Sequence, residues 1–157
     1  MHIEVDDLSR PAVIALLEEH LADMHKWSPP ESVHALDVGR LKAPGITFFT
    51  AWEGDTLLGC GAVRELDPTH GEIKSMRTPN AQRRHGAGRA ILQHILEVAR
   101  TRGYSRLSLE TGSSEGFLPA QRLYESAGFT KSGAFGEYVA DSFKLFMTKE
   151  LAPSGAD

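Results

Sequence analysis

The sequence predicts a single α/β domain in which a mixed sheet of about seven strands carries helices on both faces. One observation is the order of its hydrophobic patterns, β-α-α-β-β-β-α-β-α-β-β, which is a meander followed by βαβ units. Such an order combines antiparallel with parallel strand pairing. The other is a length of 157 residues without repeat or linker, which fits one domain. We expect this domain to span residues 1–151, followed by a fraying tail at 152–157.

The limits of several predicted elements are set by residues that start or end a helix. Ser9 precedes Pro11 as a helix start, and the prolines at 29–30 end that helix. Gly103 and Gly128 end the two later helices. In chain order, the predicted elements are a strand at 2–5, a helix at 11–24, a short helix at 30–38, strands at 46–52, 56–65 and 72–76, a helix at 90–99, a strand at 106–110, a helix at 119–127, and strands at 129–132 and 143–149.

Residues 72–97 form the segment around which the chain is organised. Between residues 73 and 96 it holds five Lys and Arg residues and no Asp or Glu. Because the whole chain has a formal charge of −4, everything outside 73–96 sums to −9. The segment leads from a strand through a basic turn with Gly86 and Gly88 into a long apolar helix. Unpaired N–H groups and the helix dipole favour an anion at such a helix start. Glycines let a phosphate approach the backbone without a Cβ in the way. The segment therefore predicts an anion site.

Two known phosphate-binding loops fit this segment poorly. A Walker P-loop requires Gly-Lys-Ser/Thr, which is absent. The dinucleotide fingerprint requires Gly or Ala where Ile91 stands, and it requires a tight turn, whereas a polar run from Pro79 separates the strand from the glycines. Glu110 could still imitate the ribose-binding acid of that fingerprint. An ordinary helix entrance without a ligand is a further interpretation.

Three separate signatures resemble the GNAT (Gcn5-related) N-acetyltransferases, whose mostly antiparallel fold has the same element order. They are Arg83-x-x-Gly86-x-Gly88, Leu109-Glu110-Thr111 and Leu123-Tyr124-x-x-x-Gly128-Phe129. This resemblance covers nearly the whole chain and implies transfer of an acetyl group from acetyl-CoA to a primary amine by direct attack. It implies that acetyl-CoA is bound by Met76, Arg77, Arg83, Arg84, His85, Gly86, Ala87, Gly88 and Arg89.

Acetyl transfer needs a group that takes a proton from the amine and one that gives a proton to the departing thiolate. The resemblance makes Tyr124 the candidate acid, although an aromatic residue on an apolar helix stripe is more often core. Glu72 is the candidate base, through water, and a solvated strand end is its alternative interpretation. Glu110 is a second carboxylate candidate. The resemblance also implies that a backbone N–H near Met76 stabilises the developing oxyanion.

Trp27, Glu31 and His34 are predicted to form the rim of the acceptor pocket, with ordinary helix surface as the alternative. No metal is expected, because His20 and His25 are five residues apart and do not share a helix face. The single cysteine, Cys60, is predicted to be a packed strand thiol rather than an acyl-accepting nucleophile, since no base stands near it in the sequence.

Composition and charge exclude several classes of function. A net charge of −4 argues against a nucleic-acid binder, and no apolar run approaches the ~18 residues of a membrane span. One cysteine and an acidic N-terminus unlike a signal peptide favour a cytoplasmic protein. The resemblance implies a small-molecule or peptide amine as the acceptor, and a homodimer stays open. A non-catalytic acyl-CoA-binding module on the same fold is the alternative function.

Overall fold

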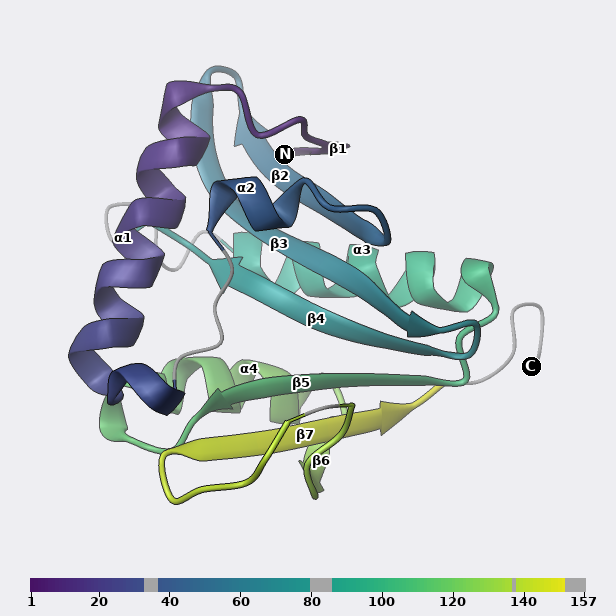
Figure 1. Ribbon diagram of the computed structural model, residues 1–157. Helices are drawn as coiled ribbons and strands as arrows, with labels where there is room; N and C mark the ends of the chain where they lie inside the picture. The colour runs from purple at the N-terminus through teal and green to yellow at the C-terminus, as the bar shows by residue number, and fades with distance from the viewer. Residues whose placement is uncertain (33–36, 80–85, 137, 152–157) are drawn as a thin grey trace.

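The computed structural model describes residues 1–32, 37–79, 86–136 and 138–151. A seven-stranded sheet in the order β1-β2-β3-β4-β5-β7-β6 forms its centre (Figure 1). Neighbouring strands pair antiparallel except for β4 with β5, which confirms the predicted mixed, mostly antiparallel sheet. The strands are β1 (His2–Val5), β2 (Ile46–Glu53), β3 (Thr56–Asp67), β4 (His70–Arg77), β5 (Arg106–Gly112), β6 (Thr130–Ser132) and β7 (Lys144–Glu150).

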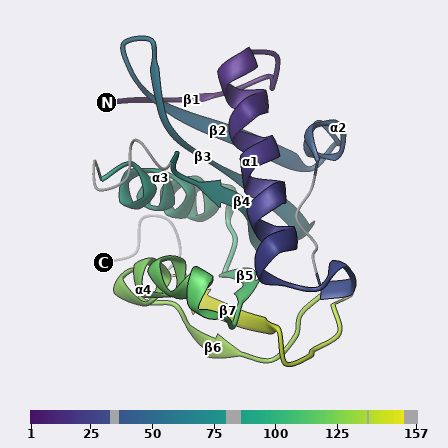
Figure 2. The ribbon, with the colours of Figure 1, turned by 90° about the vertical axis from the view of Figure 1, so that its left-hand side faces the viewer.

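Helices cover both faces of this sheet, as predicted. Figure 2 shows α1 and α2 on one face and α3 and α4 on the other. No helix in the described ranges is long and apolar enough to cross a membrane. The helices are α1 (Pro11–Trp27), α2 (Val38–Leu41), α3 (Ala87–Arg102) and α4 (Leu118–Ser126), with 3-10 turns η1 (Pro30–Ser32) and η3 (Glu115–Phe117).

The sheet separates two hydrophobic clusters. Phe48 and Phe49 are neighbours on β2 and point to opposite faces, as successive strand residues do. Phe48 belongs to the cluster under α1 and α2, whereas Phe49 belongs to the cluster under α3 and α4. The larger cluster holds the fully buried Ile91, Leu92 and Ile95 of α3. This packing fixes the start of α3 against the sheet.

Two predicted helix boundaries are wrong, and local hydrogen bonds explain both. Ser9 does not cap α1, because its hydroxyl donates to Asp7 at 2.6 Å and Arg10 takes the N-cap position. The short helix predicted at 30–38 is not one element: η1 ends at Ser32, and Asp37 is extended and caps the separate helix α2 by accepting from the Arg40 N–H at 2.8 Å. Residues 33–36 between them lie outside the described ranges.

The sheet opens between β4 and β5. Their parallel pairing ends at Ile73 and Leu109, although β4 continues to Arg77. In the same stretch the register between β3 and β4 shifts, and Ser75 has a φ of 55°, in the left-handed region. Such a bulge bends a strand and redirects its side chains. The two neighbouring strands are therefore no longer paired at Met76 and Arg77.

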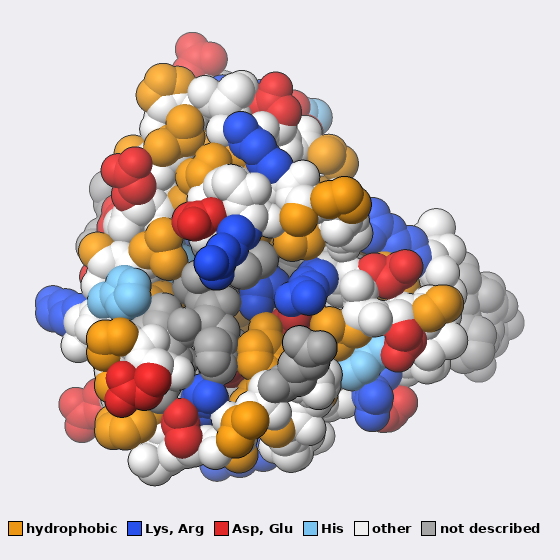
Figure 3. All heavy atoms as spheres, in the orientation of Figure 1, with side chains coloured by type: hydrophobic (Ala, Val, Ile, Leu, Met, Phe, Trp, Pro, Cys, Tyr) orange, Lys and Arg blue, Asp and Glu red, His pale blue; other side chains and the backbone are white. Residues whose placement is uncertain are grey.

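Charge is unevenly distributed over the surface. On the face that carries α1 and α2, Lys and Arg side chains gather over the middle of β3 and β4 (Figure 3). Asp and Glu side chains lie mostly toward the edges of the same view. The net charge of −4 therefore does not make this face uniformly acidic.

Candidate active site

Two hollows meet where the sheet opens. A groove of about 550 Å³ extends from the first turn of α3 to α4, and a cavity of about 110 Å³ lies beside the ends of β4 and β5. Five residues line both hollows, so they form the junction between them: His20, Met24, Met76, Ala120 and Tyr124. A molecule in the groove can therefore reach a molecule in the cavity at this junction.

The groove end at α3 has the features of an anion site. Gly86 is the N-cap of the helix, with a φ of 77° and no side chain to occupy the first-turn N–H groups. Gly86, Ala87, Gly88 and Arg89 line the groove, and a Cβ on Gly88 would lie 3.3 Å from Leu123. A helix N-terminus of this kind presents donors and a positive dipole to an anion. Arg83, Arg84 and His85 lie outside the described residues, so their predicted contribution stays a prediction.

The strand side of the groove is formed by Met76 and Arg77. The Met76 sulfur packs over Gly61, where an added Cβ would lie only 2.4 Å from it. The Arg77 guanidinium pairs with Glu19 at 2.6 Å and with Asp23, both on α1. This side chain therefore ties β4 to α1, and only its backbone fits the predicted contact with a bound pantetheine arm.

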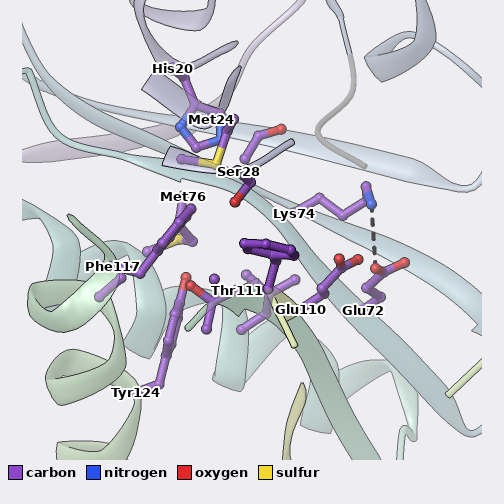
Figure 4. A pocket seen from close by; sticks show the side chains of 15 residues that line it. His20, Met24, Ser28, Glu72, Lys74, Met76, Glu110, Thr111, Phe117 and Tyr124 are labelled. Carbon is purple, nitrogen blue, oxygen red and sulfur yellow. Dashed lines mark hydrogen bonds and ion pairs between the residues drawn. The ribbon is translucent and has the colours of Figure 1, made fainter. Parts of the chain in front are cut away.

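Tyr124 stands at the junction and combines packing with an available hydroxyl. Its ring is 6% exposed and meets Phe129 edge to face, with 5.9 Å between ring centres. Figure 4 shows its hydroxyl end pointing into the cavity, toward Thr111. Burial raises the pKa of Tyr124, so the phenol keeps its proton at neutral pH. Tyr124 is therefore a core aromatic whose hydroxyl also faces the cavity.

Glu72 lies at the other end of the cavity, next to Lys74 and Glu110 (Figure 4). It is 1% exposed, so the solvated strand end that the sequence allowed is wrong. Its Oε2 atom accepts from Lys74 Nζ at 3.3 Å and from the Tyr138 hydroxyl at 2.6 Å. Its Oε1 atom is buried and has no hydrogen-bond partner among the described residues. Glu110 is half-buried and lines the same cavity.

Unpaired polar atoms concentrate around this cavity. Four buried side-chain atoms lack a partner within the described ranges, and three of them belong to the cavity lining: His20 Nδ1, Glu72 Oε1 and Ser75 Oγ. Leaving such an atom unpaired costs roughly 1–3 kcal/mol, which is why native proteins pair most of them. Burial, with the nearby charge of Arg77, lowers the pKa of His20 to about 4, so its imidazole is neutral at neutral pH. The residues around this cavity therefore hold most of the unpaired buried polar atoms of the described ranges.

Two of the three predicted rim residues are described, and neither lines the cavity. Trp27 packs on Gly116 and lies edge to face with Phe117 at 5.3 Å; it lines the groove and not the cavity. Glu31 is exposed on η1 and lines neither hollow. His34 lies outside the described residues. Within those residues, no group of three or more His, Cys, Asp or Glu side chains could hold a metal ion.

Cys60 is a packed strand thiol, as predicted. It is fully buried, its Sγ donates to the Ser75 carbonyl at 3.3 Å, and burial raises its pKa to about 12. A thiol at that pKa is a poor nucleophile. We expect Cys60→Ala to keep most of the activity, and intact-mass analysis after incubation with acetyl-CoA to find no acetyl group on the wild-type cysteine. A stable acetyl-Cys60 would instead require an enzyme-bound acyl intermediate.

Sequence reasoning missed several residues of the cavity. Lys74 could have been predicted from the sequence. It lies two residues after Glu72 on the same strand, and period-two alternation places both side chains on one face. His20 was considered only as a metal ligand. A further missed residue, Tyr138, does not line the cavity but contacts Glu72, which does. Tyr138 follows β6 without a recognisable sequence pattern and is 66 positions away from Glu72, so no local signal could have found this contact.

Known proteins share both sequence and fold with this chain. Residues 13–129 match the acetyltransferase (GNAT) family. An uncharacterized N-acetyltransferase of Bacillus subtilis, YsnE, is 55% identical over 151 residues, which is 96% of this chain and 100% of the relative. An uncharacterized N-acetyltransferase of Escherichia coli, YedL, is 47% identical over 149 residues, 95% of this chain and 94% of the relative.

Solved structures agree on the fold. A putative acyl-CoA N-acyltransferase from Klebsiella pneumoniae superposes with a TM-score of 0.77 at 24% identity, covering 96% of this chain and 97% of the other. An aminoglycoside 6′-N-acetyltransferase complexed with coenzyme A gives a TM-score of 0.71 at 15% identity, covering 99% of this chain and 100% of the other. Because the family match spans well over half of the chain and both relatives align over nearly all of it, the chain belongs to the acetyltransferase (GNAT) family and is an acetyltransferase.

Proposed function

We propose that the protein transfers an acetyl group from acetyl-CoA, bound in the groove, to a primary amine bound in the cavity. The observation that carries this proposal is the junction at Tyr124, where groove and cavity share their lining. Direct transfer requires the two substrates to meet without an enzyme-bound acyl group. The inert state of Cys60 supports direct attack, since the chain has no other cysteine.

The groove residues bind and orient the co-substrate. The first-turn N–H groups of α3, which follow Gly86, hold the diphosphate, and Arg89 adds positive charge at the same end. The backbone of Met76 and Arg77, left without a β5 partner where the sheet opens, pairs with the pantetheine arm. Acetyl-CoA supplies the activated thioester carbonyl, and these contacts bring it to the junction. That a structural neighbour, the aminoglycoside 6′-N-acetyltransferase, is complexed with coenzyme A supports acetyl-CoA as the co-substrate.

The cavity residues move the protons. Glu72 Oε1, which has no donor among the residues that the structure describes, accepts the proton of the incoming ammonium through water. A backbone N–H near Met76 stabilises the developing oxyanion. The Tyr124 hydroxyl protonates the departing thiolate, because the buried phenol is neutral and faces the junction. The base, Glu72, and the acid, Tyr124, thus lie at the two ends of the cavity.

The cavity also limits the acceptor. Its volume of about 110 Å³ favours a compact group around the reacting amine. Two carboxylates, Glu72 and Glu110, face a single lysine, Lys74, which favours an acceptor that arrives as an ammonium ion. We propose a compact small-molecule amine or the N-terminus of a peptide as the substrate.

The proposed activity is tested by a screen for acetyl transfer over classes of amine, read by release of CoA thiol and by product mass. We expect thiol release that depends on the amine and a product heavier by one acetyl group. The alternative is a non-catalytic acyl-CoA-binding module. Tight binding of acetyl-CoA without thiol release for any amine class would favour that module and contradict the proposal.

Gly86→Val tests the assignment of the groove. The branched side chain would stand where we place the diphosphate and displace at least one charge-assisted hydrogen bond, worth about 1.5–3 kcal/mol. We therefore expect the Kd for CoA, measured by calorimetry, to rise about 10- to 100-fold. Gly45→Val is the matched control, because Gly45 also has a positive φ, of 86°, and lies outside the groove. Equal CoA affinity in both variants would show that the diphosphate binds elsewhere.

A further inference from the structure

Three residues form a closed hydrogen-bonded ring at the candidate base. Lys74 Nζ donates to the Tyr138 hydroxyl at 2.8 Å and to Glu72 Oε2 at 3.3 Å. The Tyr138 hydroxyl in turn donates to the same Oε2 atom at 2.6 Å. Both donors therefore act on one carboxylate oxygen, and the other, Oε1, is buried without a partner in the described part of the chain.

Aromatic packing holds the Tyr138 hydroxyl in place. The ring meets Phe135 edge to face, with 5.2 Å between centres, and lies 6.1 Å from Phe146. Phe135 and Phe146 also contact each other, at 5.6 Å. The Tyr138 N–H donates to the Phe135 carbonyl at 3.1 Å, which fixes the backbone of the same loop. A ring held on two sides can position its hydroxyl without losing further side-chain entropy.

We infer that Tyr138 is a positioning residue of the acetyl transfer, which, together with Lys74, holds the Glu72 carboxylate in one orientation at the cavity. This inference rests on the proposed role of Glu72 as the base. A carboxylate with both donors on one oxygen cannot rotate without breaking two charge-assisted hydrogen bonds. The loop between β6 and β7 thereby takes part in the site, although the family resemblance assigned nothing to it.

Other charged groups near Glu72 are engaged differently. Arg64 on β3 lies opposite Glu72 in the register of β3 and β4. Glu110 lies beside Glu72 on the β5 side of the cavity. His70, on the same strand, shares a hydrogen bond with Ser108 at 2.7 Å and is within 3.2 Å of Arg106. Burial, followed by the charge of Glu72, raises the pKa of Tyr138, which therefore remains a donor at neutral pH. Removing the hydroxyl of Tyr138 therefore tests its hydrogen bond to Glu72.

Tyr138→Phe removes this donor and keeps the aromatic packing. Misplacing a reacting group can cost about 10²-fold in rate, and since Lys74 still holds Oε2 we expect kcat to fall about 10-fold. The Kd for CoA and the Tm should stay near wild type, because the groove and the ring contacts are intact. Tyr104→Phe is the matched control: its hydroxyl also donates to a carboxylate, Glu65 at 2.9 Å, away from the cavity.

A double-mutant cycle with Glu72→Gln decides how Tyr138 acts. If Tyr138 acts through the carboxylate, Tyr138→Phe should lower kcat alone and change it little in the Glu72→Gln background. A wild-type kcat for Tyr138→Phe while Glu72→Gln is slow would overturn the inference and leave the proposed function standing. A full 10-fold loss in both backgrounds would also overturn it, because Tyr138 would then act elsewhere. A wild-type rate for Glu72→Gln would refute both the base and this inference.

Discussion

Replacing Tyr124 with phenylalanine is expected to lower kcat about 10²-fold, the lower end of what a positioned proton donor contributes. The variant loses only the hydroxyl and keeps the ring contact with Phe129, so its Tm should change little. CoA affinity should also be retained, because we place the diphosphate at the far end of the groove, at the first turn of α3. Steady-state kinetics with a good acceptor, together with calorimetry for CoA, measures both quantities.

The pH dependence of the wild-type protein provides a further check on Tyr124. Burial raises its pKa above the ordinary value of about 10, so the phenol remains protonated throughout the neutral and mildly alkaline range. We therefore expect no loss of kcat from its ionisation below about pH 10. Normal turnover of Tyr124→Phe at every pH tested would show that the residue contributes packing alone.

Glu72→Gln is expected to lower the single-turnover rate at neutral pH by about 10²- to 10³-fold, within the range of general-base contributions. The defect should shrink as the pH rises, because free amine then becomes abundant and no longer needs the base. Stability is also affected, since the substitution leaves the buried ammonium of Lys74 without its anion. Breaking a buried ion pair by removing one partner costs about 3–5 kcal/mol.

A second variant separates the two effects of Glu72→Gln. Glu72→Gln combined with Lys74→Met removes both charges, so it should recover much of the lost Tm while the single-turnover rate stays low. Recovery of the rate together with the Tm would mean that the defect was one of folding. A Glu72→Gln variant as fast as the wild type at neutral pH would remove Glu72 from the mechanism and leave Glu110 as the carboxylate to test.

Strong local patterns predicted most of the fold. The order of the strands and helices, the break before residue 30 and the glycine that ends α3 all follow from residue types along the chain. The two wrong helix boundaries lie where a side chain forms a local hydrogen bond. Ser9 bonds to Asp7 instead of capping α1, and Asp37 starts a new helix, so competition between equivalent hydrogen bonds decided both boundaries.

The candidate site could be predicted only in part. The motifs pointed to Glu72, Tyr124 and the glycine turn, and the structure places Glu72 and Tyr124 around one cavity. Burial of Glu72 and its contact with Tyr138 depend on strand pairing and on a distant loop, which no local pattern encodes. Trp27 was predicted at the rim of the acceptor pocket, with ordinary helix surface as the alternative. It packs on Gly116 and lines the groove, a contact that follows from tertiary packing, and its place near the acceptor stays a prediction.

A structure of the protein with bound CoA tests the central claim most directly, namely that groove and cavity meet at Tyr124. We predict the diphosphate at the first turn of α3, next to Gly86 and Gly88, and the CoA sulfur at the junction, within about 3–4 Å of the Tyr124 hydroxyl, as a weak hydrogen bond to sulfur requires. A CoA molecule whose sulfur lies outside the junction, or whose diphosphate avoids the start of α3, would contradict this account.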